Sequence, residues 1–339
     1  MNIIFIGTSD FAVPILKFLI INCTGFNPVN INIITQPDKP VGRQQKLQAS
    51  PVKQMALKYK IPIFQPENIK DQKNIELIKK MQPDLIIVAS YGQILPKEIL
   101  EIPKFGCLNI HASLLPKYRG ASPIQSAILN NDKETGITII LMDEKMDTGK
   151  IISNTKIKIQ NNDTSQILHD KLAHLGADLL IKTLPKYIQE VKKIIKFWKK
   201  EHQKNLTIKQ IDFINPLFIS LNSSLKKQNE SNASYTKILK KEYGKIDWTK
   251  SAQEIERQIR AFSPWPGSFT KFKDKKLKIF QVKIIQRLNH CNLQPDNFFL
   301  TENKQLAIQC GQGILVIEEL QIEGKKKMSS QEFLKGHSI

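Results

Sequence analysis

The amino-terminal part of this chain alternates short, wholly apolar runs with longer amphipathic ones. Ile3–Ile6 is an apolar run that ends at Gly7, and Ile31–Ile34 and Leu85–Ala89 repeat the pattern. Between the first two runs, the apolar spacing of Phe11–Ile20 predicts a helix. Wholly apolar strands that alternate with helices are typical of parallel sheets covered on both faces. The sequence therefore predicts an α/β fold with a Rossmann-like, doubly wound and mostly parallel sheet.

The loop after the first predicted strand bears on the cofactor. It reads Gly7-Thr8-Ser9-Asp10-Phe11-Ala12 and has a single glycine. The second and third glycines of the dinucleotide fingerprint, which let the backbone approach a pyrophosphate, are missing. We therefore expect that this sheet does not bind a nicotinamide cofactor.

A polar pair lies farther along the chain, on another predicted strand. Cys107–His111 alternates apolar and polar residues, so Asn109 and His111 should project from the same face. A predicted helix, Pro123–Leu129, follows, which places the pair at the carboxyl end of its strand. That edge of an open α/β sheet is where ligands bind. Taken alone, such a pair is more often a satisfied structural pair in the core.

The surroundings of this pair carry a family resemblance. The run from Asn109 through Asp147 to Gly149 closely resembles the formyltransferases that use 10-formyltetrahydrofolate, and it includes Ser113-Leu114-Leu115-Pro116, Arg119-Gly120, Glu134–Thr138 and Met142-Asp143. Three earlier segments share the resemblance, namely Gln36–Pro40, Ser50–Lys53 and Tyr91–Pro96. The resemblance implies a formyl transfer in which 10-formyltetrahydrofolate is the donor.

The resemblance also implies catalytic roles. Formyl transfer to an amine passes through a tetrahedral carbon whose oxygen is negative, and Asn109 can donate a hydrogen bond to that oxygen. A protonated His111 can add a second donor, and Asp147 can favour that cation and take the departing proton. Without the resemblance, Asp147 would be interpreted as a turn former.

Further residues are expected to line the folate pocket. The resemblance places Ser113, Leu114, Leu115 and Pro116 against the pterin, although an ordinary strand exit would also explain them. Tyr91, Gly92 and Asp143 are expected in the same cleft, although each could equally form a turn.

The carboxyl-terminal half predicts a second, smaller domain. Leu277–Val282, Leu306–Gln309 and Ile314–Ile317 are short apolar runs separated by turns, a spacing that favours a small β-barrel. Gly244–Trp248 and Ile259–Gly267 resemble the carboxyl-terminal domain of the methionyl-tRNA formyltransferases. The resemblance implies an open, oligonucleotide-binding-like barrel that grips tRNA.

Charge agrees with an RNA partner without proving it. Of the formal net charge of +20, Met1–Val191 carries +6 and Lys192–Ile339 carries +14. A basic domain suits a phosphate backbone, but a chain rich in Lys, Ile and Asn is also what a low-GC genome encodes.

One loop should contact the tRNA directly. Asp38–Leu47 resembles the family loop that inserts at the acceptor end, which makes Arg43 the main contact and Lys46 a secondary one. Gln44 and Gln45 leave this version less positive than the usual pattern. The structural alternative is a charged surface loop.

We expect three consecutive parts: a catalytic domain over residues 1–191, a polar linker or insertion over 192–234 with a helix at Val191–Lys200, and a tRNA-binding barrel over 235–339. No apolar run is long enough to span a membrane, and neither the histidines nor the cysteines show metal-ligand spacing. We expect a cytoplasmic monomer, without a metal or a membrane partner. It would transfer a formyl group from 10-formyltetrahydrofolate to methionyl initiator tRNA. The alternatives are a formyltransferase acting on an amino sugar or other small amine, and a noncatalytic RNA-binding protein.

Overall fold

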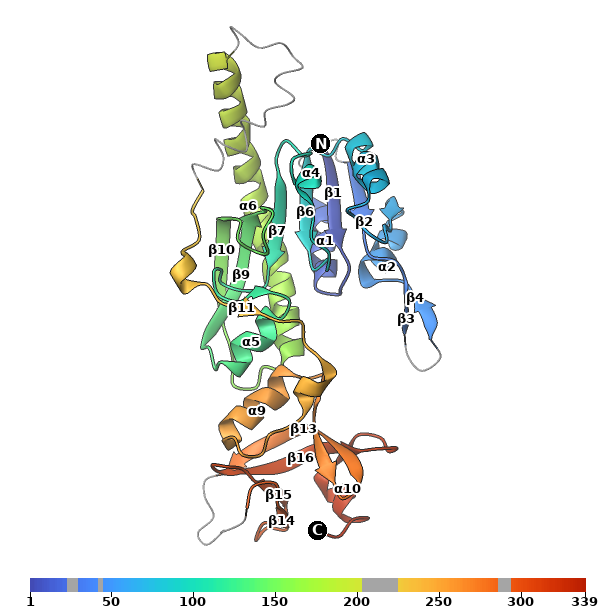
Figure 1. Ribbon diagram of the computed structural model, residues 1–339, viewed down its shortest axis with the longest axis vertical. Helices are drawn as coiled ribbons and strands as arrows, with labels where there is room; N and C mark the ends of the chain where they lie inside the picture. The colour runs from blue at the N-terminus through green and yellow to red at the C-terminus, as the bar shows by residue number, and fades with distance from the viewer. Residues whose placement is uncertain (23–29, 42–44, 203–224, 286–293) are drawn as a thin grey trace. The chain divides into compact units, whose positions relative to one another are not determined.

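The computed structural model describes residues 1–22, 30–41, 45–202, 225–285 and 294–339 (Figure 1). The described chain forms two compact units, and each is built from three separate stretches of sequence. The first unit contains Met1–Gly120, Thr135–Ile157 and Asp170–Tyr235. The second unit contains Ala121–Glu134, Lys158–His169 and Thr236–Ile339. The division of the chain into three consecutive parts stays a prediction.

A seven-stranded sheet forms the centre of the first unit. Its order is β10 (Lys150–Lys158), β9 (Glu134–Leu141), β7 (Cys107–His111), β6 (Leu85–Ala89), β1 (Asn2–Gly7), β2 (Asn30–Ile34) and β5 (Ile63–Phe64). Every pairing from β7 to β5 is parallel, and β7 pairs with β9 in the antiparallel direction. The predicted mostly parallel sheet is therefore confirmed, and each strand predicted from the apolar runs is present.

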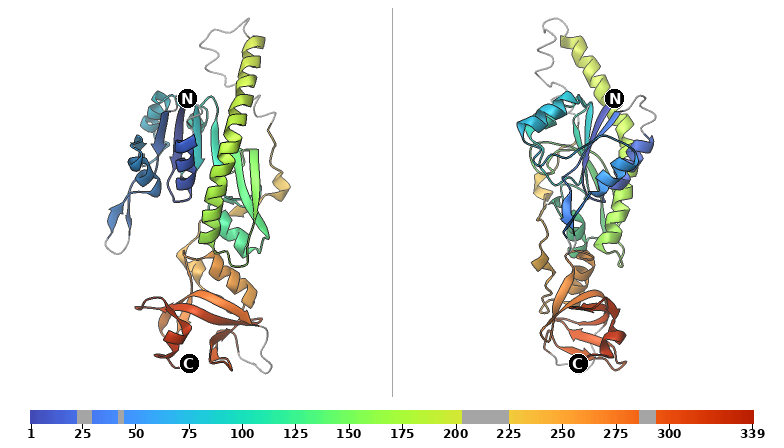
Figure 2. Two further views of the ribbon diagram at one scale, coloured as in Figure 1. Left: turned by 180° about the vertical axis from the view of Figure 1, so that it is seen from behind. Right: turned by 90° about the vertical axis from the view of Figure 1, so that its right-hand side faces the viewer.

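Helices cover both faces of this sheet, as Figure 2 shows. Helices α3 (Gln72–Lys80) and α4 (Lys97–Leu100) pack on one face, where their apolar residues share a core with Ile4 and Ile6 of β1. Helices α1 (Ala12–Asn22) and α6 (Ser165–His202) lie on the other face. The Cβ of an alanine at position 176 of α6 would lie 3.1 Å from Ile110 and 3.5 Å from Ile15. Two-sided burial explains why the strands are apolar throughout.

The strand order reverses between β1 and β6, and ligands bind at such a switch point in open α/β sheets. Two side chains join the carboxyl ends of these strands. Thr8 donates its hydroxyl hydrogen to the Tyr91 carbonyl oxygen, and Ser9 donates to the hydroxyl of Ser90 at 2.7 Å. The edge that sequence analysis assigned to a ligand is thus a connected polar surface.

Helix α6 is longer than the sequence prediction. We expected a helix only at Val191–Lys200, within a linker, but one helix runs from Ser165 to His202. The apolar residues Leu184, Ile188 and Val191 follow a helical period and are all buried, so the packing of the domain continues up to the start of the expected linker. The first residues of the expected linker, as far as His202, are therefore helical.

The second unit is built around an antiparallel sheet. The strand order is β12 (Ser268–Phe272), β13 (Lys275–Ile285), β16 (Ile314–Ile322), β15 (Leu306–Gln309) and β14 (Phe298–Leu300), with β17 (Met328–Ser329) paired to β16. The sheet curls into a half-barrel around an apolar core that includes Trp248 and Phe333. This confirms the expected second, smaller open β-barrel.

Helices α5 (Pro123–Leu129), α9 (Ala252–Ala261) and α10 (Ser330–Leu334) complete the second unit. Helix α9 begins with a reciprocal capping box, in which Ser251 and Glu254 each bind the other's backbone N–H. Arg257 of α9 donates to the carbonyl oxygen of Leu129 at the end of α5, at 3.2 Å. The predicted helix at Pro123–Leu129 is confirmed, and it packs within this unit.

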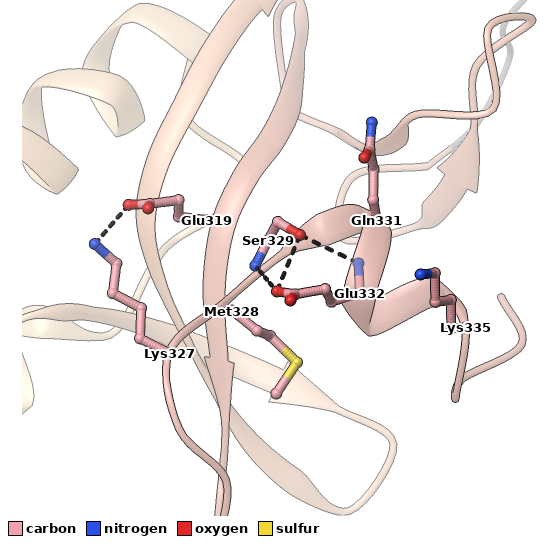
Figure 3. A pocket seen from close by; sticks show the side chains of 7 residues that line it. All are labelled: Glu319, Lys327, Met328, Ser329, Gln331, Glu332 and Lys335. Atoms are coloured by element: carbon pink, nitrogen blue, oxygen red, sulfur yellow. Dashed lines mark hydrogen bonds and ion pairs between the residues drawn. The ribbon is translucent and has the colours of Figure 1, made fainter.

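A hollow on the second unit is lined mainly by polar side chains (Figure 3), namely Glu319, Lys327, Met328, Ser329, Gln331, Glu332 and Lys335. Two of its charges are paired, because Lys327 Nζ lies 2.5 Å from Glu319 Oε2. Glu332 accepts hydrogen bonds from Ser329 and so caps α10. It contains none of the expected catalytic residues.

Among the described residues, no helix is both long enough and apolar enough to cross a membrane. Cys107 and Cys310 are buried free thiols, while Cys23 and Cys291 lie outside the described part of the chain. Burial raises the pKa of the Cys310 thiol to about 12.

Candidate active site

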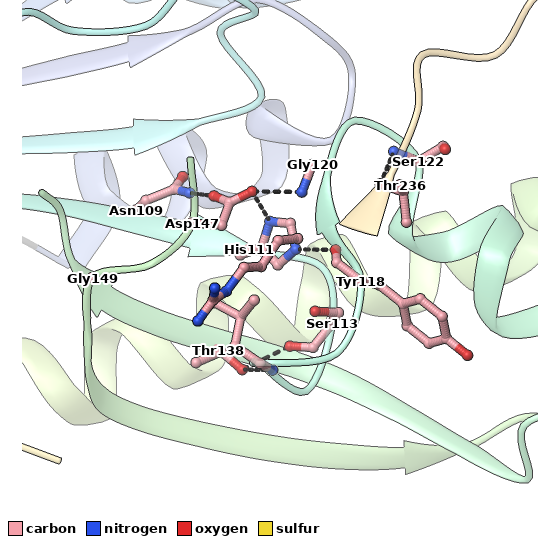
Figure 4. A network of polar contacts seen from close by, with 12 residues as sticks. Asn109, His111, Ser113, Tyr118, Gly120, Ser122, Thr138, Asp147, Gly149 and Thr236 are labelled. Carbon is pink, nitrogen blue, oxygen red and sulfur yellow. Dashed lines mark hydrogen bonds and ion pairs between the residues drawn. The ribbon is translucent and has the colours of Figure 1, made fainter. Parts of the chain in front are cut away.

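The three expected catalytic side chains meet at the carboxyl end of β7 (Figure 4). Asn109 Nδ2 donates to Asp147 Oδ1 at 3.0 Å, and His111 Nδ1 lies 3.6 Å from Asp147 Oδ2. Ile110, between them on the strand, faces α6 instead. The prediction that Asn109 and His111 share one face is therefore confirmed, and Asp147 lies opposite both.

Hydrogen bonding fixes the orientation of the His111 ring. Its Nε2 lies 2.9 Å from the carbonyl oxygen of Tyr118, and only 7% of the side chain is exposed. A carbonyl oxygen can only accept, so Nε2 must carry a hydrogen. The other ring nitrogen faces the Asp147 carboxylate, where a second ring proton would form an ion pair. This pocket can therefore hold the imidazolium with both of its N–H groups directed at acceptors.

The loop that carries Asp147 has an unusual backbone. Asp147 has φ +55°, the left-handed region that aspartate tolerates better than most residues. Two residues later, a Cβ on Gly149 would lie 2.0 Å from the carbonyl oxygen of Leu141, so only glycine fits. Asp143 Oδ1 accepts from Thr148 Oγ1 at 2.6 Å and from the Lys145 N–H at 3.2 Å. In this arrangement Asp143 shapes the loop that presents Asp147.

The segment from Ser113 to Pro116 is held by one residue of β9. Thr138 Oγ1 donates to the Ser113 carbonyl oxygen at 2.7 Å and accepts from the Leu115 N–H at 3.1 Å. Ser113 and Leu115 are buried, whereas Leu114 and Pro116 are only half-buried. Of the four expected folate contacts, the side chains of Leu114 and Pro116 are the ones accessible from the surface.

Tyr91 turns its side chain away from the edge of the sheet. The ring packs in the core with Ile4 and Ile6, and burial raises the pKa of its hydroxyl to about 12. Its carbonyl oxygen accepts from Gln36 Nε2 at 2.5 Å. Gly92 follows with φ +85°, and a Cβ there would lie 2.6 Å from Gln36 Nε2. What Tyr91 offers at the switch point is therefore its backbone.

Comparison with known proteins identifies the family. A family model described as formyl transferase matches residues 1–184, and one described as formyl transferase, C-terminal domain, matches residues 238–338. The methionyl-tRNA formyltransferase of Caldanaerobacter subterraneus subsp. tengcongensis is 41% identical over 340 residues, which cover 100% of this chain and 98% of the relative. That of Methylacidiphilum infernorum is 42% identical and covers 99% of this chain and 95% of the relative.

This chain belongs to the methionyl-tRNA formyltransferase family. A solved structure of WlaRD, a sugar 3N-formyl transferase, in the presence of dTDP and 5-N-formyl-THF, matches with a TM-score of 0.61 and 24% identity, over 96% of this chain and 99% of that one. At that identity the likeness shows the fold alone. Membership makes the chain a formyl-transferring enzyme whose donor is a formyl-tetrahydrofolate. Among the residues that the structure describes, no group of His, Cys, Asp and Glu could hold a metal ion.

The expected tRNA loop of this formyltransferase is a hairpin. Strands β3 (Lys39–Val41) and β4 (Lys46–Gln48) pair in the antiparallel direction, and Lys46 is exposed on the second of them. Arg43 and Gln44 lie outside the described residues. At the base of the hairpin, Lys53 Nζ lies 2.7 Å from Asp38 Oδ2, and this hydrogen bond lowers the pKa of the carboxyl group.

Sequence reasoning missed three residues beside the site. Arg119, which was noted only as part of a motif, is fully buried and binds both Gln228 and Glu230. Gln228 and Glu230 belong to the segment that we interpreted as a polar linker. A buried Arg needs acceptors, so Arg119 predicts a partner, but no signal in the sequence indicates which distant residues supply it.

Proposed function

We propose that this enzyme transfers the formyl group of 10-formyltetrahydrofolate to the amino group of methionyl initiator tRNA, as a monomer in the cytoplasm. The observation that carries the proposal is the Asp147 carboxylate, which binds Asn109 and faces His111 at the carboxyl end of β7. The full-length similarity to relatives that are named methionyl-tRNA formyltransferases supports the identity of the acceptor.

The reaction makes two demands on the site. The methionyl nitrogen attacks the formyl carbon, the formyl oxygen becomes negative, and the bond from carbon to N10 of the folate breaks. The attacking nitrogen must lose a proton, and N10 must gain one. A site for this reaction needs a hydrogen-bond donor for the oxygen and a group that moves a proton.

Asn109 is the proposed donor to the negative oxygen. Its amide nitrogen carries two hydrogens, and Asp147 accepts one of them at 3.0 Å. Removing a donor of this kind typically reduces the rate about 10²- to 10³-fold. The contact with Asp147 holds the amide in place before substrate arrives, which is the preorganisation that makes such donors effective.

His111 is proposed to stabilise the negative oxygen, and Asp147 is proposed to accept a proton. The imidazolium form of His111 would place a buried positive charge near the negative oxygen, and the Asp147 carboxylate, 3.6 Å from Nδ1, suits that form. Asp147 accepts from the Gly120 N–H at 2.8 Å, and its position beside the pair suits removal of the proton from the amine, directly or through one water.

The substrates are proposed to approach from different parts of the chain. Folate would lie along Ser113–Pro116, with Leu114 and Pro116 covering the pterin and Tyr91, Gly92 and Asp143 at the edges of the cleft. Arg43 and Lys46 of the β3–β4 hairpin would contact the acceptor end of the tRNA. Exposed lysines on β12 and β13, including Lys271, Lys275 and Lys283, suit the phosphate backbone. We also propose residues 1–191 as the catalytic domain, 192–234 as the linker and 235–339 as the tRNA-binding domain.

The test is a single-turnover transfer of labelled formyl from 10-formyltetrahydrofolate. Charged initiator tRNA should be formylated, whereas free methionine and a nucleotide-linked amino sugar should not. Asn109→Ala, His111→Ala and Asp147→Asn should each reduce the rate constant at least about 10²-fold. Asp71→Asn makes the same chemical change at the N-cap of α3, where Asp71 is half-buried, and should leave the rate unchanged. Faster transfer to the amino sugar than to the tRNA would contradict the proposal that methionyl initiator tRNA is the acceptor. Rate constants of the three site variants within threefold of that of the original enzyme would contradict the catalytic assignment.

A further inference from the structure

The described residues that lead into the second unit touch the loops that hold the Asp147 carboxylate. We call residues 226–235 the return segment. The Lys226 carbonyl oxygen accepts from the Ile151 N–H of β10 at 3.0 Å. At the other end, the Ser234 carbonyl oxygen accepts from the Arg119 N–H at 2.8 Å, where β8 (Arg119–Gly120) pairs with β11 (Tyr235–Thr236). The return segment therefore lies across the loops on both sides of Asp147.

Gln228, within this segment, binds the backbone of the Asp147 loop. Its Nε2 donates to the carbonyl oxygens of Asp147 at 2.8 Å and Gly149 at 2.7 Å. Its Oε1 accepts from Arg119 Nε at 3.1 Å and from Nη2 at 2.9 Å. Carbonyl oxygens only accept and a guanidinium only donates, so these four contacts fix which end of the amide is which.

Arg119 in turn fixes the position of Gln228. The guanidinium is fully buried, and it donates from Nη1 and Nη2 to the two carboxylate oxygens of Glu230 at 2.8 and 2.7 Å. Nη1 also donates to the Tyr235 hydroxyl at 2.9 Å. A buried guanidinium with planar, forked donors permits little rearrangement, because each of those donors needs an acceptor. The hydrogen bond from Arg119 holds the pKa of the Glu230 carboxyl group below its usual value.

The backbone of Asp147 is thus restrained by Gln228, and its carboxylate is restrained by the residue that follows Arg119. Gln228 binds its carbonyl oxygen, while the N–H of Gly120, the residue after Arg119, binds its carboxylate at 2.8 Å. Asp147 needs this support because its φ of +55° is a sparsely populated conformation for a residue with a side chain. Without Gln228, the loop would be free to relax toward more favourable backbone angles.

We propose that Gln228 is a positioning residue for the transfer reaction: through its two hydrogen bonds to the Asp147 loop, the return segment holds the catalytic carboxylate in register with Asn109 and His111. The proposal rests on the catalytic role proposed for Asp147. In this proposal, a residue of the expected linker sets the position of the Asp147 carboxylate and does not itself contact the substrate.

The test separates the donor function of Gln228 from its bulk. Gln228→Glu keeps an acceptor for Arg119 but removes both donors, and Gln228→Met removes all polar contacts at similar size. Gln54→Glu is the matched control, because Gln54 Nε2 also donates to a backbone carbonyl oxygen, that of Ala49 at 2.9 Å, from an exposed position of α2 (Pro51–Lys58). Rate constants are measured in single turnovers at saturating folate and tRNA, where a loss of folded enzyme lowers the amplitude and leaves the rate constant unchanged.

We expect both Gln228 variants to reduce the rate constant about tenfold or more, because small displacements of a catalytic group are costly, while the apparent affinities for folate and tRNA stay within about twofold. Combining Gln228→Glu with Asp147→Asn should slow the reaction little beyond Asp147→Asn alone, since the effect passes through the carboxylate. Normal rate constants in both Gln228 variants, with Asp147→Asn slow, would overturn this inference alone. A fully additive double variant would also overturn it. A normal rate in Asp147→Asn would overturn the catalytic assignment as well.

Discussion

Thr138→Val should loosen the segment that is proposed to line the folate pocket. Thr138 is fully buried on β9, and its hydroxyl serves two backbone groups at once, the Ser113 carbonyl oxygen at 2.7 Å and the Leu115 N–H at 3.1 Å. Valine has nearly the same shape, so the substitution removes the two hydrogen bonds without opening a large cavity.

The expected cost follows from the burial of the partners. A buried polar group that loses its only partner costs about 1–3 kcal/mol, and two groups are affected here. Because the segment can shift to recover part of this energy, we expect a loss of about 2–3 kcal/mol. For a chain of 339 residues, that corresponds to a fall in melting temperature of about 3–4 °C.

Thermal and urea unfolding of the variant, together with folate binding, would check this estimate. Thr249→Val is the control, since the Thr249 hydroxyl donates to the exposed Asp247 carboxylate at 2.6 Å and water can replace that bond at a cost below about 1 kcal/mol. Folate affinity should fall in Thr138→Val and stay unchanged in Thr249→Val. Equal destabilisation by the two substitutions would refute the idea that Thr138 anchors this segment.

Three further changes test other parts of the structure. Leu114→Trp adds bulk to the half-buried side chain of the proposed folate segment and should weaken folate binding with little loss of stability; unchanged affinity would remove Leu114 from the pocket. Arg43→Ala should reduce formyl transfer more than tRNA affinity, because one cation supplies little of the attraction but can position the amine; equal losses in a titration and a single-turnover assay would reduce it to a simple phosphate contact. Asp84→Asn tests the acid limit of stability. Burial raises the pKa of Asp84, but hydrogen bonds from Lys104 and the Asn2 N–H outweigh burial and leave the pKa lowered. The stability that Asp84 adds is therefore present above about pH 4 and is lost as the pH falls further. The free energy of unfolding of the variant should depend less steeply on pH in this acid range.

The sequence was most informative where one period dominates. The strands at Leu85–Ala89 and Cys107–His111 agree with prediction residue for residue. The first is buried and apolar along its whole length, whereas the second was predicted from its alternation of apolar and polar residues. Helix α6 is much longer than predicted. Its carboxyl-terminal end is polar and rich in lysine, so it resembles a linker, although Ile188 and Val191 just before it are buried at helical spacing.

The same contrast holds for the site. Asn109 and His111 could be placed together because they are two residues apart on a strand, so their geometry is local. Gln228 and Arg119 are 109 positions apart, and no periodicity joins them. A contact between residues far apart in the sequence, with one partner in an irregular segment, leaves no pattern in a single sequence.

The two compact units interleave along the chain. Residues of α5 and the stretch Lys158–His169 belong with the barrel, although they are encoded within the catalytic half, and Ser165 Oγ donates to the Ser263 carbonyl oxygen at 2.6 Å. The barrel unit is therefore not encoded by one continuous stretch of sequence. A chimera that exchanged only the carboxyl-terminal third between two relatives would separate α9 from the α5 that it evolved against. Recombination between such enzymes would have to carry three pieces of sequence together, which favours inheritance of the chain as a whole.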